Sequence, residues 1–122
     1  MACSSCHGGV LFSEHSFQNN GLYEDYEDDG RFRLTLEESD RALFKVHSLR
    51  NVALTPPYMH DGSIESLEEV IEHYDSGGAA HPNKSPLVKA LNLTDIEKDE
   101  LIAFLHTLTD YDFISNEIYL PE

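Results

Sequence analysis

Two cysteines and a histidine near the start of the chain have the types and spacing to hold a metal-containing cofactor. They form the segment Cys3-Ser4-Ser5-Cys6-His7, in which the cysteines lie about one helical turn apart. Two thiols at this spacing can each add to a vinyl group on one edge of a porphyrin, and the adjacent histidine can bind the iron. The motif therefore predicts a covalently attached haem c with His7 as the proximal ligand.

The same residue types also suit a zinc site or a thioredoxin-like redox pair. A structural zinc site needs a second ligand pair at a suitable spacing, and the chain has no cysteine beyond these two. A thioredoxin-like pair belongs to a βαβ pattern, which the sequence does not show. Haem is therefore favoured over both alternatives.

A haem iron takes a second axial ligand or keeps an open site, and the sequence leaves several candidates for it. Met59 and His60 follow two prolines, in a loop that can present a ligand rigidly. Tyr74 lies on the apolar face of an expected helix, where a tyrosine more often belongs to the core. His73 is also a candidate, although it lies off that apolar face, and His47 and His15 are less favoured.

Arg50 is a candidate for binding a haem propionate. A guanidinium fork matches a carboxylate well, although an ordinary surface arginine explains Arg50 equally well. The remaining histidines, His81 and His106 among them, are typical of surface positions.

Two helices are expected to position these side chains. The first has Ser66 as its N-cap and Glu69 as the partner of a capping box, and it ends at Gly77. The second has Thr94 as its N-cap and Glu97 as its box partner. Their apolar stripes consist of Leu67, Val70, Ile71 and Tyr74 in the first helix and of Leu101, Phe104, Leu105 and Leu108 in the second.

The rest of the chain has the composition of loops. Residues 13–43 are polar, with a short extended piece expected at 31–36. Residues 44–62 indicate a short helix followed by a structured loop, because Pro56-Pro57 excludes helix there. No repeat and no strand alternation long enough for a sheet is visible. We therefore expect a single all-α domain over residues 1–122, with a few helices and long loops.

The charge balance is strongly acidic, with 23 Asp and Glu against 8 Lys and Arg, for a formal net charge of −15. This charge disfavours binding to nucleic acid or anionic membranes and favours a basic protein partner, unless it serves solubility alone. No stretch approaches the ~20 apolar residues of a membrane span, and no signal peptide is visible. Because bacteria attach haem c outside the cytoplasm, we expect a periplasmic protein whose leader is not part of this sequence.

Several segments together resemble the C-terminal haem domain of the bacterial di-haem cytochrome c peroxidase and MauG family. They are CSSCHGG, FQNNGLY, GRFRLT, the run FKVHSLRNVALTPPYMHDGSIESLEEVIEHYDSGG at 44–78 and TDIEKDELIAFLHTLTD. The resemblance covers nearly the whole chain. It implies a class I cytochrome c-like domain around one haem, which passes electrons from a small donor protein to a second, peroxide-reducing haem. That second haem lies in an N-terminal domain, which this sequence does not contain.

The resemblance also implies roles for individual residues. Cys3 and Cys6 match the thioether positions and His7 matches the proximal ligand. MauG-like members place an axial tyrosine at the position of Tyr74, so the resemblance favours Tyr74 as the distal ligand over Met59.

Further positions match the family less directly. His60 matches a histidine close to the haem, and the backbone carbonyls of Thr55 and Pro57 match ligands of an interdomain calcium ion, whose other ligands belong to the second domain.

The chain departs from the family pattern at two points. His47 stands where the family usually has proline, and the chain has no tryptophan to relay electrons. The resemblance assigns no catalytic residue to this domain, which is expected to be inactive on its own. The alternatives are a free-standing mono-haem electron carrier without enzymatic activity and a domain that lacks haem as prepared.

Overall fold

A computed structural model of the chain describes residues 3–119. Most of its secondary structure elements are short. In chain order they are α1 (Cys3–Cys6), β1 (Phe17–Gln18), α2 (Phe32–Thr35), η1 (Glu38–Asp40), β2 (Phe44–Lys45), η2 (Val52–Leu54), α3 (Leu67–Ser76), α4 (Asp95–Thr107), α5 (Tyr111–Ile114) and η3 (Glu117–Tyr119).

The expectation of an all-α fold is wrong. Strands β1 and β2 pair in antiparallel fashion, with Phe17 opposite Lys45 and Gln18 opposite Phe44. An isolated parallel bridge pairs Gly30 with Leu43, the residue directly before β2. Strands of two residues are too short to show an alternating pattern, and their partners are more than 25 residues apart in sequence. Residues 31–36 are expected to be extended but contain α2. Residues 44–45 begin a segment in which a short helix is expected, but they form strand β2.

The two long helices begin where the sequence predicts, and α3 also ends there, whereas α4 ends at Thr107, one residue before Leu108 of its expected stripe. The Ser66 hydroxyl accepts a hydrogen bond from the Glu69 N–H at the start of α3, and Gly77 ends this helix with a φ of 84°. The Glu69 carboxylate accepts from the Glu65 N–H instead of closing the box on Ser66. At α4, Thr94 and Glu97 form the complete capping box.

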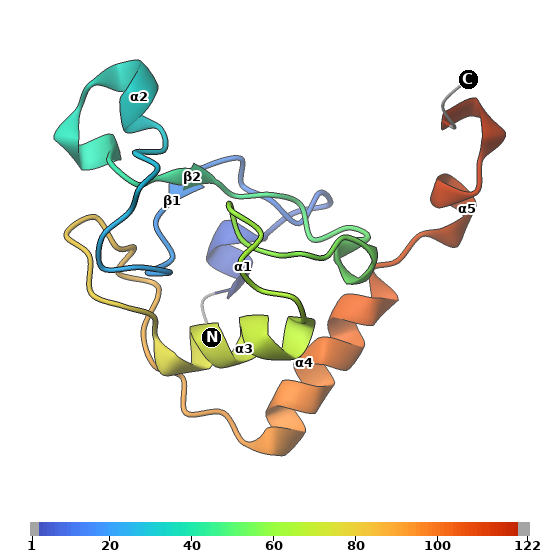
Figure 1. The fold of residues 1–122 in the computed structure, drawn as a ribbon. Coiled ribbons are helices and arrows are strands. Elements are labelled where there is room, and N and C mark those ends of the chain that lie inside the picture. The colour runs from blue at the N-terminus through green and yellow to red at the C-terminus, as the bar shows by residue number, and fades with distance from the viewer. Residues whose placement is uncertain (1–2, 120–122) are drawn as a thin grey trace.

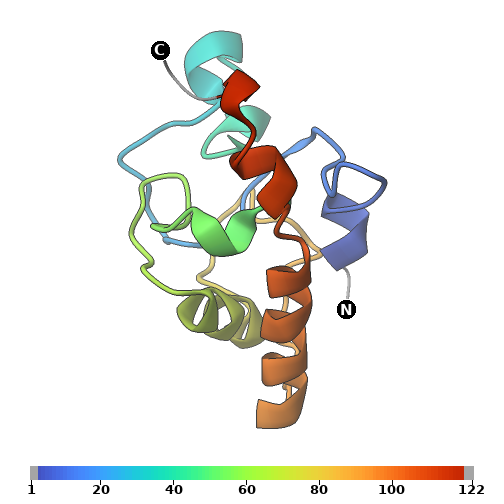
Figure 2. The ribbon, with the colours of Figure 1, turned by 90° about the vertical axis from the view of Figure 1, so that its right-hand side faces the viewer.

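Helices α3 and α4 pack against each other on one side of the molecule, and the sheet and α2 lie on the other side (Figure 1). Helix α1 lies at an intermediate level between them, and α5 extends away from the body beyond the end of α4 (Figures 1 and 2). Among the described residues, the buried apolar side chains are Ala42, Val46 and Leu67. No helix within 3–119 is both long enough and apolar enough to cross a membrane.

Candidate functional site

Helix α1 presents both cysteines and ends directly at His7. The His7 N–H donates to the Cys3 carbonyl over 2.8 Å, so the helical turn continues to the histidine. Both thiols are free, and Cys3 is exposed while Cys6 is half-buried. Gly8 lets the chain turn tightly here, because a Cβ atom at this position would lie 2.8 Å from the Ser4 carbonyl oxygen.

The His7 imidazole is oriented by the backbone of the loop that follows. Its Nδ1 lies 3.2 Å from the carbonyl oxygen of Phe12. A carbonyl only accepts, so Nδ1 carries the proton and the Nε2 lone pair is free to bind a metal. Burial lowers the pKa of His7, against the opposing hydrogen bonds to the Phe12 and His47 backbone, and this favours the neutral ligand form. The His47 side chain itself is exposed, and the part of this residue that interacts with His7 is its backbone.

The two candidates for the distal ligand, Met59 and Tyr74, both lie close to the side-chain amide of Asn20. Asn20 Nδ2 lies 3.2 Å from the Met59 sulfur and 3.5 Å from the Tyr74 hydroxyl. Met59 has a left-handed backbone (φ 74°) in a loop closed by the bridge between Tyr58 and Ile64. Tyr74 comes from α3 and is half-buried. Sequence reasoning found both candidates but missed Asn20, although the FQNNGLY segment contains it.

Tyr74 is close to the cysteine motif. Burial raises the pKa of Tyr74, and Cys6 and Cys3 raise it further, whereas the hydrogen bond from Asn20 opposes the rise. A phenol in this setting stays protonated at neutral pH unless a positive charge such as a ferric iron faces it. The raised pKa of Tyr74 thus reflects the burial of the phenol and the negative charge that the two thiols can carry.

Asn19 is a second residue that sequence reasoning missed. Its side chain is fully buried and bridges several parts of the chain. Asn19 Nδ2 donates to the Ala42 carbonyl over 3.0 Å, while Oδ1 accepts from the Gly21 N–H over 2.8 Å and from the Tyr26 hydroxyl over 3.3 Å. Asn19 therefore fixes the segment that carries Asn20.

His60 belongs to an aromatic cluster. Its ring stacks on Phe44 with the ring centroids 3.8 Å apart, and it also lies near Tyr26 at 5.7 Å. His60 is exposed. The structure therefore gives His60 aromatic neighbours, and its proximity to a haem stays a prediction.

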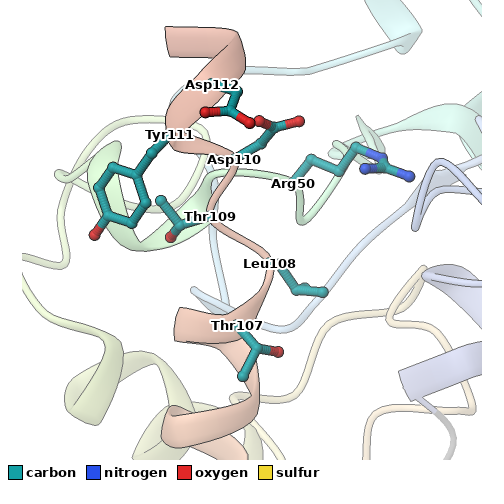
Figure 3. Close-up of a pocket in the computed structure, with 7 residues that line it drawn as sticks. All are labelled: Arg50, Thr107, Leu108, Thr109, Asp110, Tyr111 and Asp112. Carbon is teal, nitrogen blue, oxygen red and sulfur yellow. The ribbon is translucent and has the colours of Figure 1, made fainter. Parts of the chain in front are cut away.

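Arg50 binds the loop that follows the cysteine motif. Its Nε and Nη2 both donate to the Val10 carbonyl, at 3.0 and 2.5 Å, and its guanidinium lies 5.8 Å from the Phe12 ring centre. Arg50 also borders an open pocket of about 510 Å³ formed with residues 107–112. Its guanidinium turns away from the carboxylates of Asp110 and Asp112 (Figure 3). The motif residues do not line this pocket, so Arg50 supports the loop near His7.

Thr55 and Pro57 are both exposed. Neither backbone carbonyl accepts a backbone hydrogen bond from another described residue, so both oxygens are available to a ligand. Within residues 3–119, no cluster of three or more His, Cys, Asp or Glu side chains is arranged to hold a metal ion. A calcium site at this segment stays a prediction.

The donor groups and the large accessible surface of the chain both suit a bound haem. Two free thiols, a neutral imidazole with a free Nε2, and a phenol or thioether are the groups that bind haem c. The accessible surface of 8210 Å² is roughly a quarter larger than the ~6,600 Å² expected for a compact monomer of 13.8 kDa. A chain with this much exposed surface can cover part of it with a bound haem and part of it with another protein domain.

The short helix that ends in a backbone-oriented histidine and the loops around it are consistent with a cytochrome c-like fold. No family model matches the chain. The chain is 37% identical to methylamine utilization protein MauG of Methylorubrum extorquens over 107 residues, which cover 87% of this chain and 30% of that protein. It is 35% identical to cytochrome c peroxidase Ccp of Escherichia coli over 129 residues, which cover 98% of this chain and 23% of that protein.

The chain belongs to the family of bacterial di-haem cytochrome c peroxidases and MauG, and it spans about a third or less of the length of these relatives. The crystal structure of a MauG-like protein associated with microbial copper homeostasis is similar to it, with a TM-score of 0.88 and 39% identity over 94% of this chain and 44% of that one. The di-haem peroxidase BthA of Burkholderia thailandensis shares the fold, with a TM-score of 0.69 and 20% identity over 92% of this chain and 40% of that chain.

Proposed function

We propose that this chain is a c-type haem domain that transfers electrons within a larger peroxidase or MauG-type oxidoreductase. One observation carries the proposal: α1 presents two free thiols next to an imidazole that burial keeps neutral and whose Nδ1 is held by the Phe12 carbonyl. Family membership supports this assignment, because the chain retains the complete CxxCH motif.

In the proposed site, Cys3 and Cys6 hold the porphyrin through thioether bonds, and His7 Nε2 is the proximal iron ligand. A bound haem supplies reversible one-electron chemistry at iron. Burial favours the neutral imidazole, the Phe12 carbonyl keeps the ring correctly turned, and Arg50 keeps the intervening loop in place through Val10.

The distal ligand in this proposal is Tyr74, with Met59 as the alternative. Phenolate oxygen donates negative charge and stabilises ferric iron, whereas a thioether favours ferrous iron and a higher potential. Asn20 can donate to the phenolic oxygen and thereby favour its deprotonated form. A tyrosine ligand would suit storage of an oxidising equivalent, and a methionine ligand would suit a simple electron relay.

The wider context is also part of the proposal. The chain would be the C-terminal domain of a longer periplasmic protein, and an N-terminal domain would carry the peroxide-reducing haem. A small, basic donor protein would supply electrons, because the chain has a net charge of −15. Thr55 and Pro57 would contribute carbonyl ligands to calcium at the boundary with the second domain.

The test is to express the chain in a host that matures c-type cytochromes and to compare Tyr74→Phe with Met59→Leu. We expect covalent haem in all three proteins, a large change in the ferric absorption spectrum of Tyr74→Phe, and little change in Met59→Leu. The reverse pattern would assign Met59 as the ligand. A wild-type protein that carries no covalent haem under these conditions would refute the proposed function.

A further inference from the structure

A cluster of aromatic rings lies next to the proposed haem site and reaches the surface at Tyr23. The Tyr23 and Tyr26 ring centroids are 5.5 Å apart and meet edge to face. Tyr26 in turn contacts the rings of Phe44 at 5.8 Å, His60 at 5.7 Å and His81 at 5.3 Å. None of the roles proposed above uses the two tyrosines.

Tyr23 combines exposure with a positioned proton acceptor. Its side chain is 37% exposed, and its hydroxyl donates to Asp61 Oδ2 over 2.7 Å. The other oxygen of Asp61 accepts from the Ser63 N–H over 3.1 Å, which fixes the carboxylate. A phenol that loses one electron must also lose its proton, and a carboxylate within hydrogen-bond reach can take that proton in the same step.

Tyr26 connects this surface position with the interior. Its hydroxyl accepts from the Leu22 N–H over 2.8 Å and donates to the buried Asn19. The next residue, Asn20, contacts the hydroxyl of Tyr74. A short, ordered route thus runs from the surface at Tyr23 to the proposed distal ligand.

We propose that Tyr23 is a redox-active surface tyrosine that passes an electron inward through Tyr26 to the haem site while its phenolic proton moves to Asp61. The proposal rests on the proposed function, in which hydrogen peroxide oxidises the haem centres. Tyr23 loses one electron and one proton and becomes a neutral phenoxyl radical, Asp61 becomes a carboxylic acid, and the electron reduces the oxidised haem site. A one-electron donor at the surface then reduces the radical, and the proton returns from Asp61 to the phenol.

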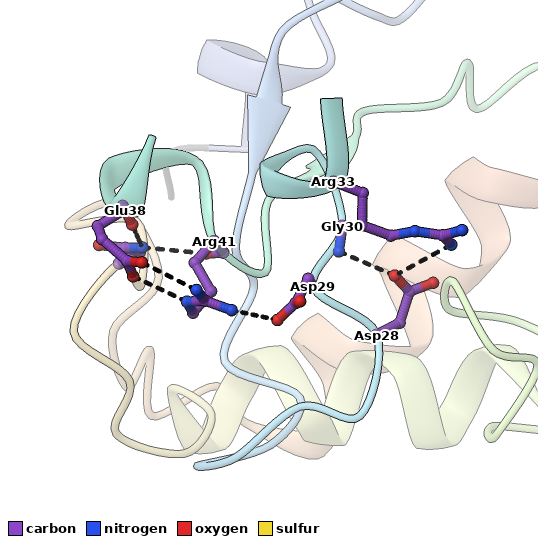
Figure 4. Close-up of polar contacts among 7 residues, drawn as sticks. Asp28, Asp29, Gly30, Arg33, Glu38 and Arg41 are labelled. Atoms are coloured by element: carbon purple, nitrogen blue, oxygen red, sulfur yellow. Dashed lines mark hydrogen bonds and ion pairs between the residues drawn. The ribbon is translucent and has the colours of Figure 1, made fainter. Parts of the chain in front are cut away.

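The charges around Tyr23 indicate that this donor is cationic. The acidic segment 24–29 follows Tyr23 directly in sequence. Two of its carboxylates form ion pairs that offset their negative charge: Asp28 lies 4.0 Å from Arg33, and Asp29 pairs with Arg41 (Figure 4). In the part of the chain that the structure describes, Glu24, Asp25 and Glu27 form no ion pair and are exposed. Such a field concentrates positively charged reductants.

The first experiment tests the pairing of Tyr23 with Asp61 without haem. A photo-oxidised ruthenium tris-bipyridine complex removes electrons from tyrosines, and peptide mass spectrometry measures the oxidised fraction at each one. We expect Tyr23 to be oxidised more than Tyr111, which is 69% exposed and has no carboxylate hydrogen-bonded to its hydroxyl in the described structure.

Two matched variants separate the proton acceptor from the local charge. Asp61→Asn keeps the acceptor for the Ser63 N–H but cannot take the phenolic proton, so we expect oxidation of Tyr23 to fall by about tenfold or more. Glu24→Gln removes one neighbouring charge and should leave the oxidation of Tyr23 nearly unchanged. Equal effects of the two variants, or oxidation that follows exposure alone, would overturn the role of Asp61.

The second experiment tests the same route in the reverse direction, in haem-loaded, ferrous protein. A flash-generated radical at Tyr23 should then be refilled by an electron from the haem, which bleaches the ferrous absorption band. We expect Tyr23→Phe to remove this phase, Tyr26→Phe to slow it several-fold, and Tyr111→Phe to leave it unchanged. Bleaching that is insensitive to Tyr23→Phe would refute the route. Covalent haem is quantified separately, so that its absence is recorded as a failure of the proposed function and the Asp61 result still stands.

Discussion

Substitution of Asn19 tests how much its buried side-chain hydrogen bonds stabilise the fold around the candidate site. Its amide is the largest fully buried side chain, and it joins the segment after β1 to the Ala42 carbonyl and the Gly21 N–H. Replacement by alanine leaves these two buried backbone groups without their partners, since neither has another hydrogen bond among the described residues. The Tyr26 hydroxyl keeps its bond from the Leu22 N–H.

The magnitude follows from these two groups. A buried polar group that loses its partner costs about 1–3 kcal/mol, so Asn19→Ala should lower the free energy of unfolding by about 2–6 kcal/mol. A domain of 122 residues has a total stability of about 6–18 kcal/mol. The variant thus loses a large part of it, and we expect its melting temperature to fall by roughly 10–20 °C.

Thermal unfolding followed by circular dichroism measures this change, with all proteins in the same haem-loading state. Asn116→Ala is the matched control, because the Asn116 side chain accepts a single hydrogen bond, from the Ile118 N–H in an exposed turn. We expect this control to change stability by less than about 0.5 kcal/mol. If Asn19→Ala were as mild as Asn116→Ala, the assignment of Asn19 as the buried hydrogen-bonding centre would be refuted.

Two further predictions concern glycine geometry and acid stability. Gly77→Ala places a Cβ against the Ala90 backbone at a φ of 84°, whereas Gly9→Ala meets only the cost of its φ of 67° in open space. Chemical denaturation should therefore show Gly77→Ala to be less stable than Gly9→Ala by about 1–3 kcal/mol, and equal stabilities would contradict the close approach. The Leu93 N–H and then the Lys98 ammonium hold the pKa of Asp75 below its ordinary value of 3.8. The stability that Asp75 contributes is present above that value and is lost as the pH falls through the lowered pKa. Asp75→Asn should lack this acid-dependent loss in a pH series of melting temperatures, and an unchanged pH profile would contradict it.

The parts of the fold that sequence reasoning predicted correctly are set by local interactions. Ser66 and Thr94 accept the predicted capping bonds, and Gly77 ends α3 in the left-handed conformation. These features depend on residues a few positions apart. The apolar stripe of α3 buries Leu67. The predicted stripe of α4 is less buried, because Phe104 remains 48% exposed.

Long-range pairing explains the parts that could not be predicted. The sheet joins residue 17 to residue 45 through two hydrogen-bonded pairs, and no periodicity marks strands of that length. Helix α2 is a single turn without a side-chain cap, so its sequence carried no start signal. The candidate site follows the same rule. The adjacent residues Cys3, Cys6 and His7 could be recognised from spacing, whereas Asn20 meets Met59 and Tyr74 only after folding.

The contacts of Asn20 show how Tyr74 and Met59, the two candidate distal ligands, are placed relative to each other. The sequence presents these residues as alternatives from different elements, a helix and a loop. In the structure, the phenolic oxygen and the sulfur lie 3.5 and 3.2 Å from the same amide nitrogen, so the two atoms cannot be farther apart than the sum of these distances. His73, one residue before Tyr74, lies with Nε2 3.1 Å from the Asn20 carbonyl oxygen. The two side chains therefore lie at the same place in the fold, and in the proposed site the segment that follows β1 would hold both of them through Asn20.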